Sequence, residues 1–385
     1  MSVPTQSEQL RYFKKQQPKI VESIRQLVEI ESPSDVKQAV DRLGTVLASR
    51  FAELGGRIVM HPAEKFGNHL QVEFKGAGKS KNQKPVLLLG HMDTVYPIGA
   101  ISKMPCRIAK GRLYGPGVLD MKSGIGLAIR SLEAMLNWNA GKLPRGITIL
   151  LVSDEEVGST SSREITEALA RKSAAVLVLE PAQGLAVKTS RKGICEYTFQ
   201  VTGKAAHSGL DFENGQSAIL ELAKQIQQIS QLVDLERGIT VNVGKINGGT
   251  RSNVVAAEAT AVIDVRVSRI EDGREIDRKL RSLKTFNRNC KIAISGGMNR
   301  PPMERSAGVA ALYDKATAVA GELGWKLQEV SVGGGSDGNF TAALGIPTLD
   351  GLGGVGEGAH AEHESVIISE LPNRAALLAG LIGRI

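Results

Sequence analysis

Residues 85–93 read PVLLLGHMD, a short apolar run that ends in a histidine and an aspartate. Two later segments have the same form, ITILLVSDEE at residues 147–156 and AVLVLEP at residues 175–181. Continuous apolar runs of about four to eight residues are typical of strands that are buried on both faces of a parallel sheet. The three segments therefore predict an α/β fold with a mixed, largely parallel sheet and helices on both faces.

Patterns with helical spacing lie around these predicted strands. Residues 20–28 and 40–54 each place their large apolar side chains on one face, and residues 125–135 do the same between two of the runs. Ser34 is a candidate N-cap for the second of these helices. The three segments are therefore expected to supply helices that cover the sheet.

The pattern changes near residue 193. From there to residue 303 the predicted order is strand, helix, strand, strand, helix, strand, which is the order of a ferredoxin-like α+β module. After Pro301 and Pro302 the alternation of helix and strand returns. We therefore expect an inserted domain at 193–303 within a discontinuous parent domain at 1–192 and 304–385.

The composition limits the class of protein. A chain of 385 residues with 42% hydrophobic and 23% charged residues is long enough for two domains of ordinary globular composition. Its start lacks the apolar stretch of a secretory signal, and no later run is long enough to cross a bilayer, so we expect a cytoplasmic protein. The three cysteines form no CxxC pair. Any metal should therefore be bound by histidine and carboxylate side chains.

The net charge of +8 raises the question of nucleic-acid binding. Lysine and arginine are spread along the chain, and only 4% of the residues are aromatic, so platforms for base stacking are scarce. We expect neither a nucleic acid nor a membrane as partner. A mildly positive field suits an enzyme with small anionic substrates.

Ligand-type residues follow each of the apolar runs. His91 follows the first run, Glu155 and Glu156 the second, and Glu180 ends the third, while His360 comes shortly after the late segment IPTL. Open parallel sheets bind ligands at the carboxyl ends of their strands. These side chains are therefore expected to converge in one crevice.

Two further residues belong to the same pattern. Asp93 lies two residues after His91, where its carboxylate could fix the tautomer of a metal-binding ring, although a surface histidine beside an aspartate is the simpler alternative. Asp120 lies in the glycine-rich segment GPGVLDMKSG, which permits unusual backbone angles and a strained peptide after Asp120. A helix N-cap is the alternative for Asp120.

The acidic pair and the late histidine leave alternatives open. Adjacent carboxylates at Glu155 and Glu156 repel one another unless cations compensate them, or they form the acidic first turn of a helix. In GVGEGAHAEHES, His360 follows the glycine-rich approach, His363 competes with it, and Glu364 could orient the ring. His61 and His69 lie outside such contexts and are expected to be surface or packing residues.

A series of short motifs follows in a specific order along the chain. They are GHMDTVYP, GPGVLDMKSG, SDEEVGS, LEPA, GKAAHSG, SNVV with DVR, GGGSDGNF and GAHAEHE. From about residue 85 to 365 this series resembles, in order and spacing, the glutamate carboxypeptidase family of two-zinc peptidases. Aminoacylases, acetylornithine deacetylase and succinyl-diaminopimelate desuccinylase are related to that family.

The resemblance implies a role for each site residue. His91 and Glu180 would bind one zinc ion, Glu156 and His360 would bind the other, and Asp120 would bridge them. Glu155 would be the general acid and base, and Asp93 would support His91. Nitrogen and oxygen ligands also suit cobalt or manganese.

The inserted domain is implied to act as a lid and dimerisation domain. His207 resembles a histidine that reaches across a homodimer to stabilise the oxyanion, and Asn253 and Arg266 resemble residues that hold the substrate carboxylate. The alternatives are a surface histidine and an ion pair between Arg266 and Asp264. Further donors to the substrate carboxylate would be Gly334, Gly335 and Ser336.

The resemblance implies a metal-dependent carboxypeptidase that releases C-terminal glutamate from small peptides or folate-type N-acyl conjugates. An N-acyl amino acid deacylase or a dipeptidase of the same family is the alternative within this chemistry. A non-catalytic binding protein on the same scaffold is the alternative of another class, and it would require the loss of a ligand or of the base.

Overall fold

A computed structural model describes residues 4–77 and 82–385 of the chain. The described residues form two compact units. The first unit consists of the chain up to Ser190 together with Arg305–Ser331 and Ser336–Ile385, and the second consists of Arg191–Glu304 and Val332–Gly335. Each unit has a hydrophobic core of its own.

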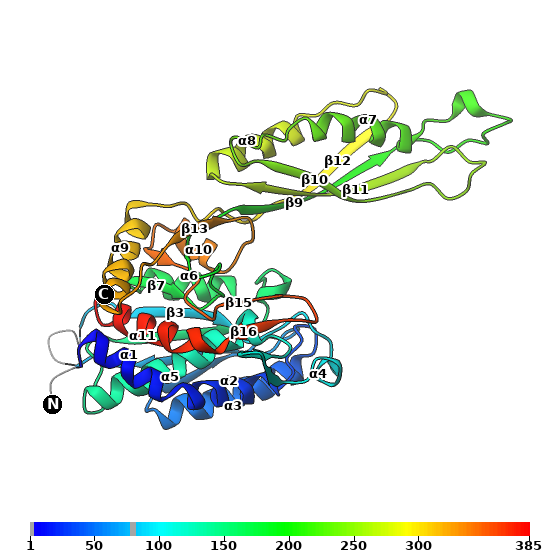
Figure 1. Ribbon diagram of the computed structural model, residues 1–385. Helices are drawn as coiled ribbons and strands as arrows, with labels where there is room; N and C mark the ends of the chain where they lie inside the picture. The colour runs from blue at the N-terminus through cyan, green and yellow to red at the C-terminus, as the bar shows by residue number, and fades with distance from the viewer. Residues whose placement is uncertain (1–3, 78–81) are drawn as a thin grey trace. The chain divides into compact units, whose positions relative to one another are not determined.

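The first unit is built on a six-stranded sheet (Figure 1). Its strands, in spatial order, are β1 (Arg57–His61), β2 (His69–Phe74), β6 (Ile147–Val152), β3 (Val86–His91), β7 (Ala175–Val178) and β14 (Thr348–Leu349). The four strands from β6 to β14 are parallel, and β2 pairs antiparallel with both β6 and β1. The sheet is therefore mixed and largely parallel, as the apolar runs predict.

Both faces of the sheet are buried at its central strands, which explains why β7 is apolar at every position and β3 is apolar up to Leu89. Val86 and Leu88 of β3 point into the core on one face, whereas Leu87 and Leu89 point into the core on the other. The first face is covered by α1 (Gln6–Lys15), α2 (Gln17–Val28), α3 (Lys37–Glu53), α5 (Ser123–Trp138), α9 (Ala307–Glu322) and α11 (Leu371–Ile382). The second face is covered by α6 (Arg163–Arg171) and α10 (Gly338–Ala343).

One helix start differs from the sequence prediction. Val36 is the N-cap of α3, and its side chain forms no capping hydrogen bond. The hydroxyl of Ser34 donates instead to the carboxylate of Asp93, at 2.7 Å. Ser34 therefore does not cap the helix, because its side chain is held by a loop that follows β3.

Two smaller sheets and one short helix accompany the six-stranded sheet. A four-stranded sheet contains β15 (Gly356–Glu357), β16 (Ser365–Ile367), β5 (Arg112–Tyr114) and β4 (Arg107–Ala109). A two-stranded sheet joins β8 (Val187–Arg191) and β13 (Glu329–Val332), and α4 (Ala100–Lys103) is a single turn. In the described part of the chain, no helix combines the length and apolar character that crossing a membrane requires.

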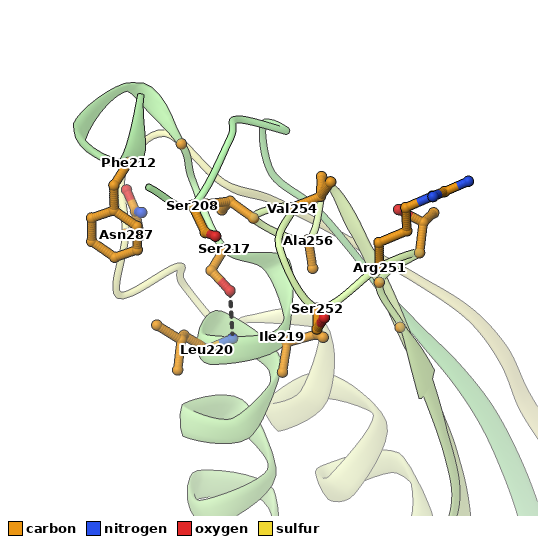
Figure 2. A pocket seen from close by; sticks show the side chains of 15 residues that line it. Ser208, Phe212, Ser217, Ile219, Leu220, Arg251, Ser252, Val254, Ala256 and Asn287 are labelled. Atoms are coloured by element: carbon orange, nitrogen blue, oxygen red, sulfur yellow. Dashed lines mark hydrogen bonds between the residues drawn. The ribbon is translucent and has the colours of Figure 1, made fainter. Parts of the chain in front are cut away.

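The second unit has the ferredoxin-like α+β arrangement that the order of elements predicts. Its antiparallel sheet has the order β10 (Thr240–Gly248), β11 (Glu258–Val267), β9 (Gly193–Thr202) and β12 (Lys291–Arg300). Helices α7 (Ala218–Ser230) and α8 (Ile270–Arg281) pack on one face, and burial alternates along β9 and β11. A pocket of about 740 Å³ opens beside the start of α7 (Figure 2). The predicted fold class is thereby confirmed.

Candidate functional site

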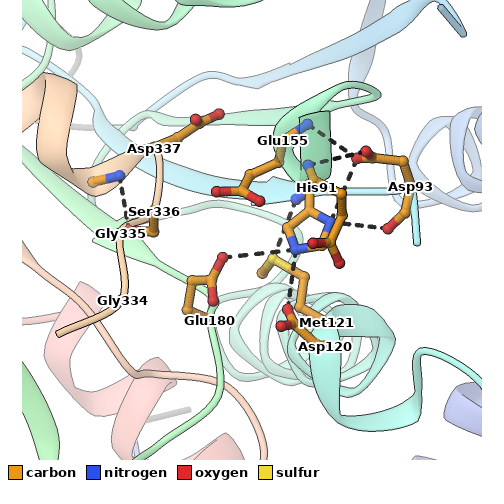
Figure 3. Close-up of polar contacts among 12 residues, drawn as sticks. His91, Asp93, Asp120, Met121, Glu155, Glu180, Gly334, Gly335, Ser336 and Asp337 are labelled. Atoms are coloured by element: carbon orange, nitrogen blue, oxygen red, sulfur yellow. Dashed lines mark hydrogen bonds and ion pairs between the residues drawn. The ribbon is translucent and has the colours of Figure 1, made fainter. Parts of the chain in front are cut away.

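A cluster of histidine and carboxylate side chains lies at the carboxyl end of the central sheet (Figure 3). His91 is the last residue of β3, Glu155 and Glu156 begin a short turn after β6, and Glu180 follows β7. Because β6, β3 and β7 are parallel neighbours, their carboxyl ends meet at one edge of the sheet. The topology therefore brings together side chains that are up to 89 positions apart, counted from His91 to Glu180.

The ring of His91 is held in a defined orientation. Nδ1 lies 2.9 Å from the backbone oxygen of Asp93, and because a carbonyl oxygen can only accept, Nδ1 carries the proton in the neutral ring. The lone pair of Nε2 then faces Asp120 Oδ1 at 3.1 Å and Glu180 Oε1 at 3.6 Å. A lone pair that faces two carboxylate oxygens needs a proton or a metal cation between them.

His360 makes the corresponding arrangement with the other oxygen of Asp120. Its Nε2 lies 3.3 Å from Glu156 Oε2 and 3.6 Å from Asp120 Oδ2. His360 has a φ of +64°, an uncommon backbone conformation for a residue other than glycine. His363 is exposed, and the contacts with Asp120 and Glu156 are made by His360.

The donor set fits divalent metal ions. Ligand atoms of His91, Asp120 and Glu156 lie within 4.8 Å of one another, as do those of His91, Glu155 and Glu180. Among the described residues, Glu156 Oε1 is buried without a hydrogen-bond partner. Histidine nitrogen and carboxylate oxygen are ligands of zinc and of related ions, and no cysteine is needed.

The electrostatics of the cluster favour positive charge. Burial lowers the pKa of His91, but hydrogen bonds to Asp120 and Asp93 outweigh burial and raise that pKa well above its usual value. Hydrogen bonds to Asp120 and Glu156 raise the pKa of His360 to about 10. Burial raises the pKa of Asp120, but the two histidines outweigh it and hold the pKa below its usual range. Bound metal cations would stabilise the carboxylates of the cluster in the same way as protonated histidines do.

Comparison with known proteins assigns the family. The model for "Peptidase family M20/M25/M40" matches residues 87–384. The chain belongs to this peptidase family. Carboxypeptidase G2 of Pseudomonas sp. (strain RS-16) is 30% identical over 377 residues, which are 95% of this chain and 89% of that protein. The chain is therefore a metallohydrolase of the M20/M25/M40 family that acts on peptides or acyl amino acids.

Solved structures share the fold at low sequence identity. Aminopeptidase PepT of Bacillus cereus ATCC 10987 has a TM-score of 0.79 at 21% identity, over 95% of this chain and 98% of that one. An M20 family metallo-carboxypeptidase of Sulfolobus solfataricus has a TM-score of 0.72 at 18% identity, over 94% of this chain and 98% of that one. These similarities confirm the fold class.

In this M20/M25/M40 family member, Asp93 contacts His91 and also the turn that carries the acidic pair. Its backbone oxygen is the closer partner of His91 Nδ1, while its carboxylate oxygen Oδ1 lies 3.5 Å from that nitrogen. The carboxylate accepts hydrogen bonds from the backbone N–H groups of Glu155 and Glu156, at 3.3 and 3.2 Å. Asp93 is fully buried and therefore holds both the ring and the acidic turn.

Glu364 also differs from its prediction. Its carboxylate accepts hydrogen bonds from the backbone N–H groups of Gly117, Leu119 and Asp120, at 2.9, 2.7 and 2.9 Å. It therefore supports the loop that carries Asp120, instead of orienting the ring of His360. The peptide bond from Asp120 to Met121 is cis. Sequence reasoning placed Glu364 near the site but could not identify its partners, which are about 245 residues away along the chain.

Five of the predicted site residues belong to the second unit of this family member, namely His207, Asn253, Arg266, Gly334 and Gly335. His207 is exposed, and its Nδ1 accepts hydrogen bonds from the N–H groups of Gly209 and Leu210, so Nε2 carries the proton of the neutral ring. Asn253 is exposed. Arg266 forms a two-pronged ion pair with Asp264, which is the alternative that its spacing suggested.

The last predicted donors lie in the segment 334–336. The backbone oxygens of Gly334 and Gly335 accept hydrogen bonds from Arg191, at 3.1 and 3.0 Å. The hydroxyl of Ser336 is fully buried and donates to Asp350 at 2.6 Å, and the N–H of Ser336 donates to Asn339. The prediction that Ser336 offers a donor to substrate therefore disagrees with the structure, because both of its donors are already used.

Proposed function

We propose that this family member is a two-zinc carboxypeptidase that releases C-terminal glutamate from small peptides or folate-type N-acyl conjugates. The observation that carries the two-metal part is the position of Asp120. One of its oxygens faces His91, and the other faces His360. Each pair is completed by a glutamate, so one carboxylate is shared by two sets of ligands.

The proposed ligands divide into two sets around Asp120. His91 and Glu180 hold one ion, and Glu156 and His360 hold the other. Zinc is the proposed metal, and cobalt or manganese would be accepted by the same nitrogen and oxygen ligands. When bound, the two ions would polarise the scissile carbonyl and lower the pKa of a water molecule.

Glu155 is the proposed general base and acid. Its ligand-type oxygen lies within 4.8 Å of those of His91 and Glu180, so it is at the edge of the metal cluster. The Glu155 carboxylate would accept the proton of the attacking water and return it to the nitrogen of the leaving amine. Asp93 would keep Glu155 in place through the hydrogen bond to its backbone N–H.

The second unit is proposed to act as a lid and as the contact in a homodimer. In this proposal His207 donates from Nε2 to the oxyanion, while Asn253 and Arg266 hold the substrate carboxylate. Arg266 would have to exchange its ion pair with Asp264 for that carboxylate, which is a cheap exchange because the pair is partly exposed.

Exposed apolar side chains support the proposed dimer. Phe212, Leu220 and Ile246 are 62%, 63% and 63% exposed. Phe212 lies in a short turn before α7, Leu220 lies in the first turn of α7, and Ile246 lies on β10. Phe212 and Leu220 line the pocket of Figure 2. Because β10 is an edge strand of its sheet, it has backbone groups that can pair with another chain.

A hydrolysis screen tests the proposed substrate. The protein would be reconstituted with zinc and given a folate-type glutamate conjugate, N-acetyl amino acids and dipeptides at equal concentrations. We expect the largest kcat/KM for the glutamate conjugate. A larger value for N-acetyl amino acids or for dipeptides would favour the deacylase or the dipeptidase.

Metal analysis tests the site itself. We expect two zinc ions per chain, and activity that a chelator removes and added zinc restores. A chain that binds no divalent ion and shows no chelator-sensitive hydrolysis would be a non-catalytic binding protein on the same scaffold.

A further inference from the structure

The turn that carries Glu155 and Glu156 is held by a second set of contacts, which does not involve Asp93 and is partly buried. The turn begins at Ser153, directly after β6, and the backbone oxygen of Asp154 accepts a hydrogen bond from the N–H of Ser159 at 2.8 Å. Asp154 is fully buried and directly precedes the acidic pair. Asp154 therefore links the end of β6 to the turn that carries the acidic pair.

His69 contacts this turn through both nitrogens of its ring. It is the first residue of β2 and is 1% exposed. Nδ1 accepts a hydrogen bond from the backbone N–H of Ser153 at 3.2 Å, and Nε2 lies 3.1 Å from the hydroxyl oxygen of Ser161. Because a backbone N–H can only donate, Nδ1 carries no proton, and the neutral ring is protonated at Nε2.

This tautomer sets the direction of a chain of hydrogen bonds. The Nε2–H of His69 donates to the hydroxyl oxygen of Ser161. The hydroxyl of Ser161 then donates to Asp154 Oδ2 at 2.8 Å, and the backbone N–H of Ser161 donates to the same oxygen at 2.7 Å. Each side chain in this series donates its one proton to the next, so the hydrogen bonds can run in only one direction, from His69 through Ser161 to Asp154.

Asp154 depends on this chain. Its other carboxylate oxygen, Oδ1, is buried without a hydrogen-bond partner among the described residues. A buried carboxylate is costly unless hydrogen bonds stabilise it, so loss of the bonds to Oδ2 would leave Asp154 nearly unsupported. Asp154 would then move, and Glu155 and Glu156 are the next two residues along the backbone.

We infer that His69 is a positioning residue that holds the acidic pair in place through Ser161 and Asp154. The ring acts on Glu155 and Glu156 through the turn, by its contacts with Ser153 and Ser161. The inference rests on the proposed function, because it concerns the residues that are proposed to bind metal and to move the proton.

A positioning role can be distinguished from a packing role by substitutions that keep only one of the two hydrogen bonds of the ring. In His69→Gln the amide nitrogen can still reach Ser161 and donate to it. In His69→Asn the side-chain oxygen can still accept from Ser153, but the shorter side chain does not bring its amide nitrogen to Ser161. We expect His69→Asn and Ser161→Ala each to lower kcat by about 10–100-fold, with KM little changed, and His69→Gln to lower kcat by less than about threefold. The double variant that combines His69→Asn with Ser161→Ala should lose no more activity than either of these two single variants.

Two readouts do not depend on turnover. The affinity for zinc, measured by competition with a chelator, should fall in His69→Asn and Ser161→Ala, because Glu156 is in the turn. Hydrogen exchange of the peptide 153–161 should become faster in the same variants. His61 is the matched control, because it pairs with His69 in the sheet and binds Gln71 instead of the turn. The substitution His61→Asn should leave all three readouts unchanged.

The outcomes separate this inference from the proposed function. Unchanged kcat, zinc affinity and exchange in His69→Asn, with only a lower melting temperature, would assign His69 to packing and overturn the inference. Wild-type protein that binds no metal and hydrolyses nothing would overturn the proposed function. Even in that case, hydrogen exchange still tests the positioning role of His69. If exchange of the peptide 153–161 is the same in His69→Asn as in the wild type, the inference is overturned as well, and if exchange is faster in the variant, the inference is supported.

Discussion

At the scale of the residue, the site depends on a few side chains that each contact several neighbours. Asp120 presents one oxygen to His91 and the other to His360, so a displacement of this one carboxylate changes both sets of proposed ligands. Its backbone is held by Glu364 and its histidine partner by Asp93. The residues that support the site therefore matter as much as the proposed ligands.

Glu155→Gln tests the division of roles within the acidic pair. The variant keeps the size of the side chain and should keep both metal ions, because Glu156 is unchanged. Turnover should fall by about 10²–10⁴-fold, since an amide cannot accept the proton. Steady-state kinetics and metal content per chain are the measurements, and Glu164→Gln on the exposed side of α6 is the control. Near-normal turnover of Glu155→Gln would contradict the assignment.

Glu364→Ala tests the support of the Asp120 loop. The carboxylate is fully buried and accepts three backbone hydrogen bonds, two of them at Oε1 and one at Oε2. We expect the free energy of unfolding to fall by roughly 2–4 kcal/mol and zinc to be bound more weakly, because three buried N–H groups lose their acceptor. Denaturant unfolding is the measurement, and exposed Glu362→Ala should be neutral. Equal stability of the two variants would refute this role.

At the scale of the element, close approach of backbones sets the position of Glu180. Gly124 lies in the first turn of α5, and a Cβ atom there would be 2.0 Å from the backbone oxygen of Leu179. Gly353 makes a similar approach from the loop after β14, at 2.3 Å from the same oxygen. The end of β7 is thus confined between a helix and a loop, and only glycine fits at either position.

Gly124→Ala should therefore force α5 away from the end of β7. We expect a loss of about 1–3 kcal/mol in the free energy of unfolding, as is usual when a packed region receives an extra methyl group, together with weaker zinc binding. Gly321→Ala in α9 is the matched control, because a Cβ there meets nothing within 4 Å. That change should be neutral or stabilising by about 0.5–1 kcal/mol. If both variants had the same stability, the packing argument would fail.

At the scale of the whole molecule, the two units have different architectures. The first unit has a sheet buried on both faces, and the second has an antiparallel sheet covered by helices on one face. A sheet with one open face and two edge strands suits contacts with other molecules. The proposed ligands belong to the first unit, while His207, Asn253 and Arg266 belong to the second.

Mixed dimers test the proposed contribution of the second unit. His207→Ala should lower kcat while leaving the metal content unchanged, because the ring is remote in sequence from every proposed ligand and exposed. If His207 acts on the partner's site, a mixture with Glu155→Gln should recover part of the activity that each variant lacks. Activity of the isolated mixed dimer is the measurement. A mixed dimer that is as inactive as the two parents would exclude action across the interface.

The sequence by itself determined the strands, the fold class and the group of proposed ligands. A strand that is buried on both faces must be apolar at every position, so runs such as PVLLLG are visible without any structure. Ligand-type residues directly after such runs must meet at one sheet edge, because parallel strands end together. These inferences need only local patterns and one general rule of topology.

Only the tertiary structure decided which groups support the site. Ser34 binds Asp93 across 59 positions, His69 binds Ser161 across 92, and Glu364 binds Gly117 across 247. No local pattern marks such pairs, since each depends on how distant backbones pack to within a hydrogen-bond length. For the same reason the structure shows the hydroxyl of Ser336 bound to Asp350 instead of open to a ligand. Periodicity reports which face a residue takes, and only packing determines which partner it meets there.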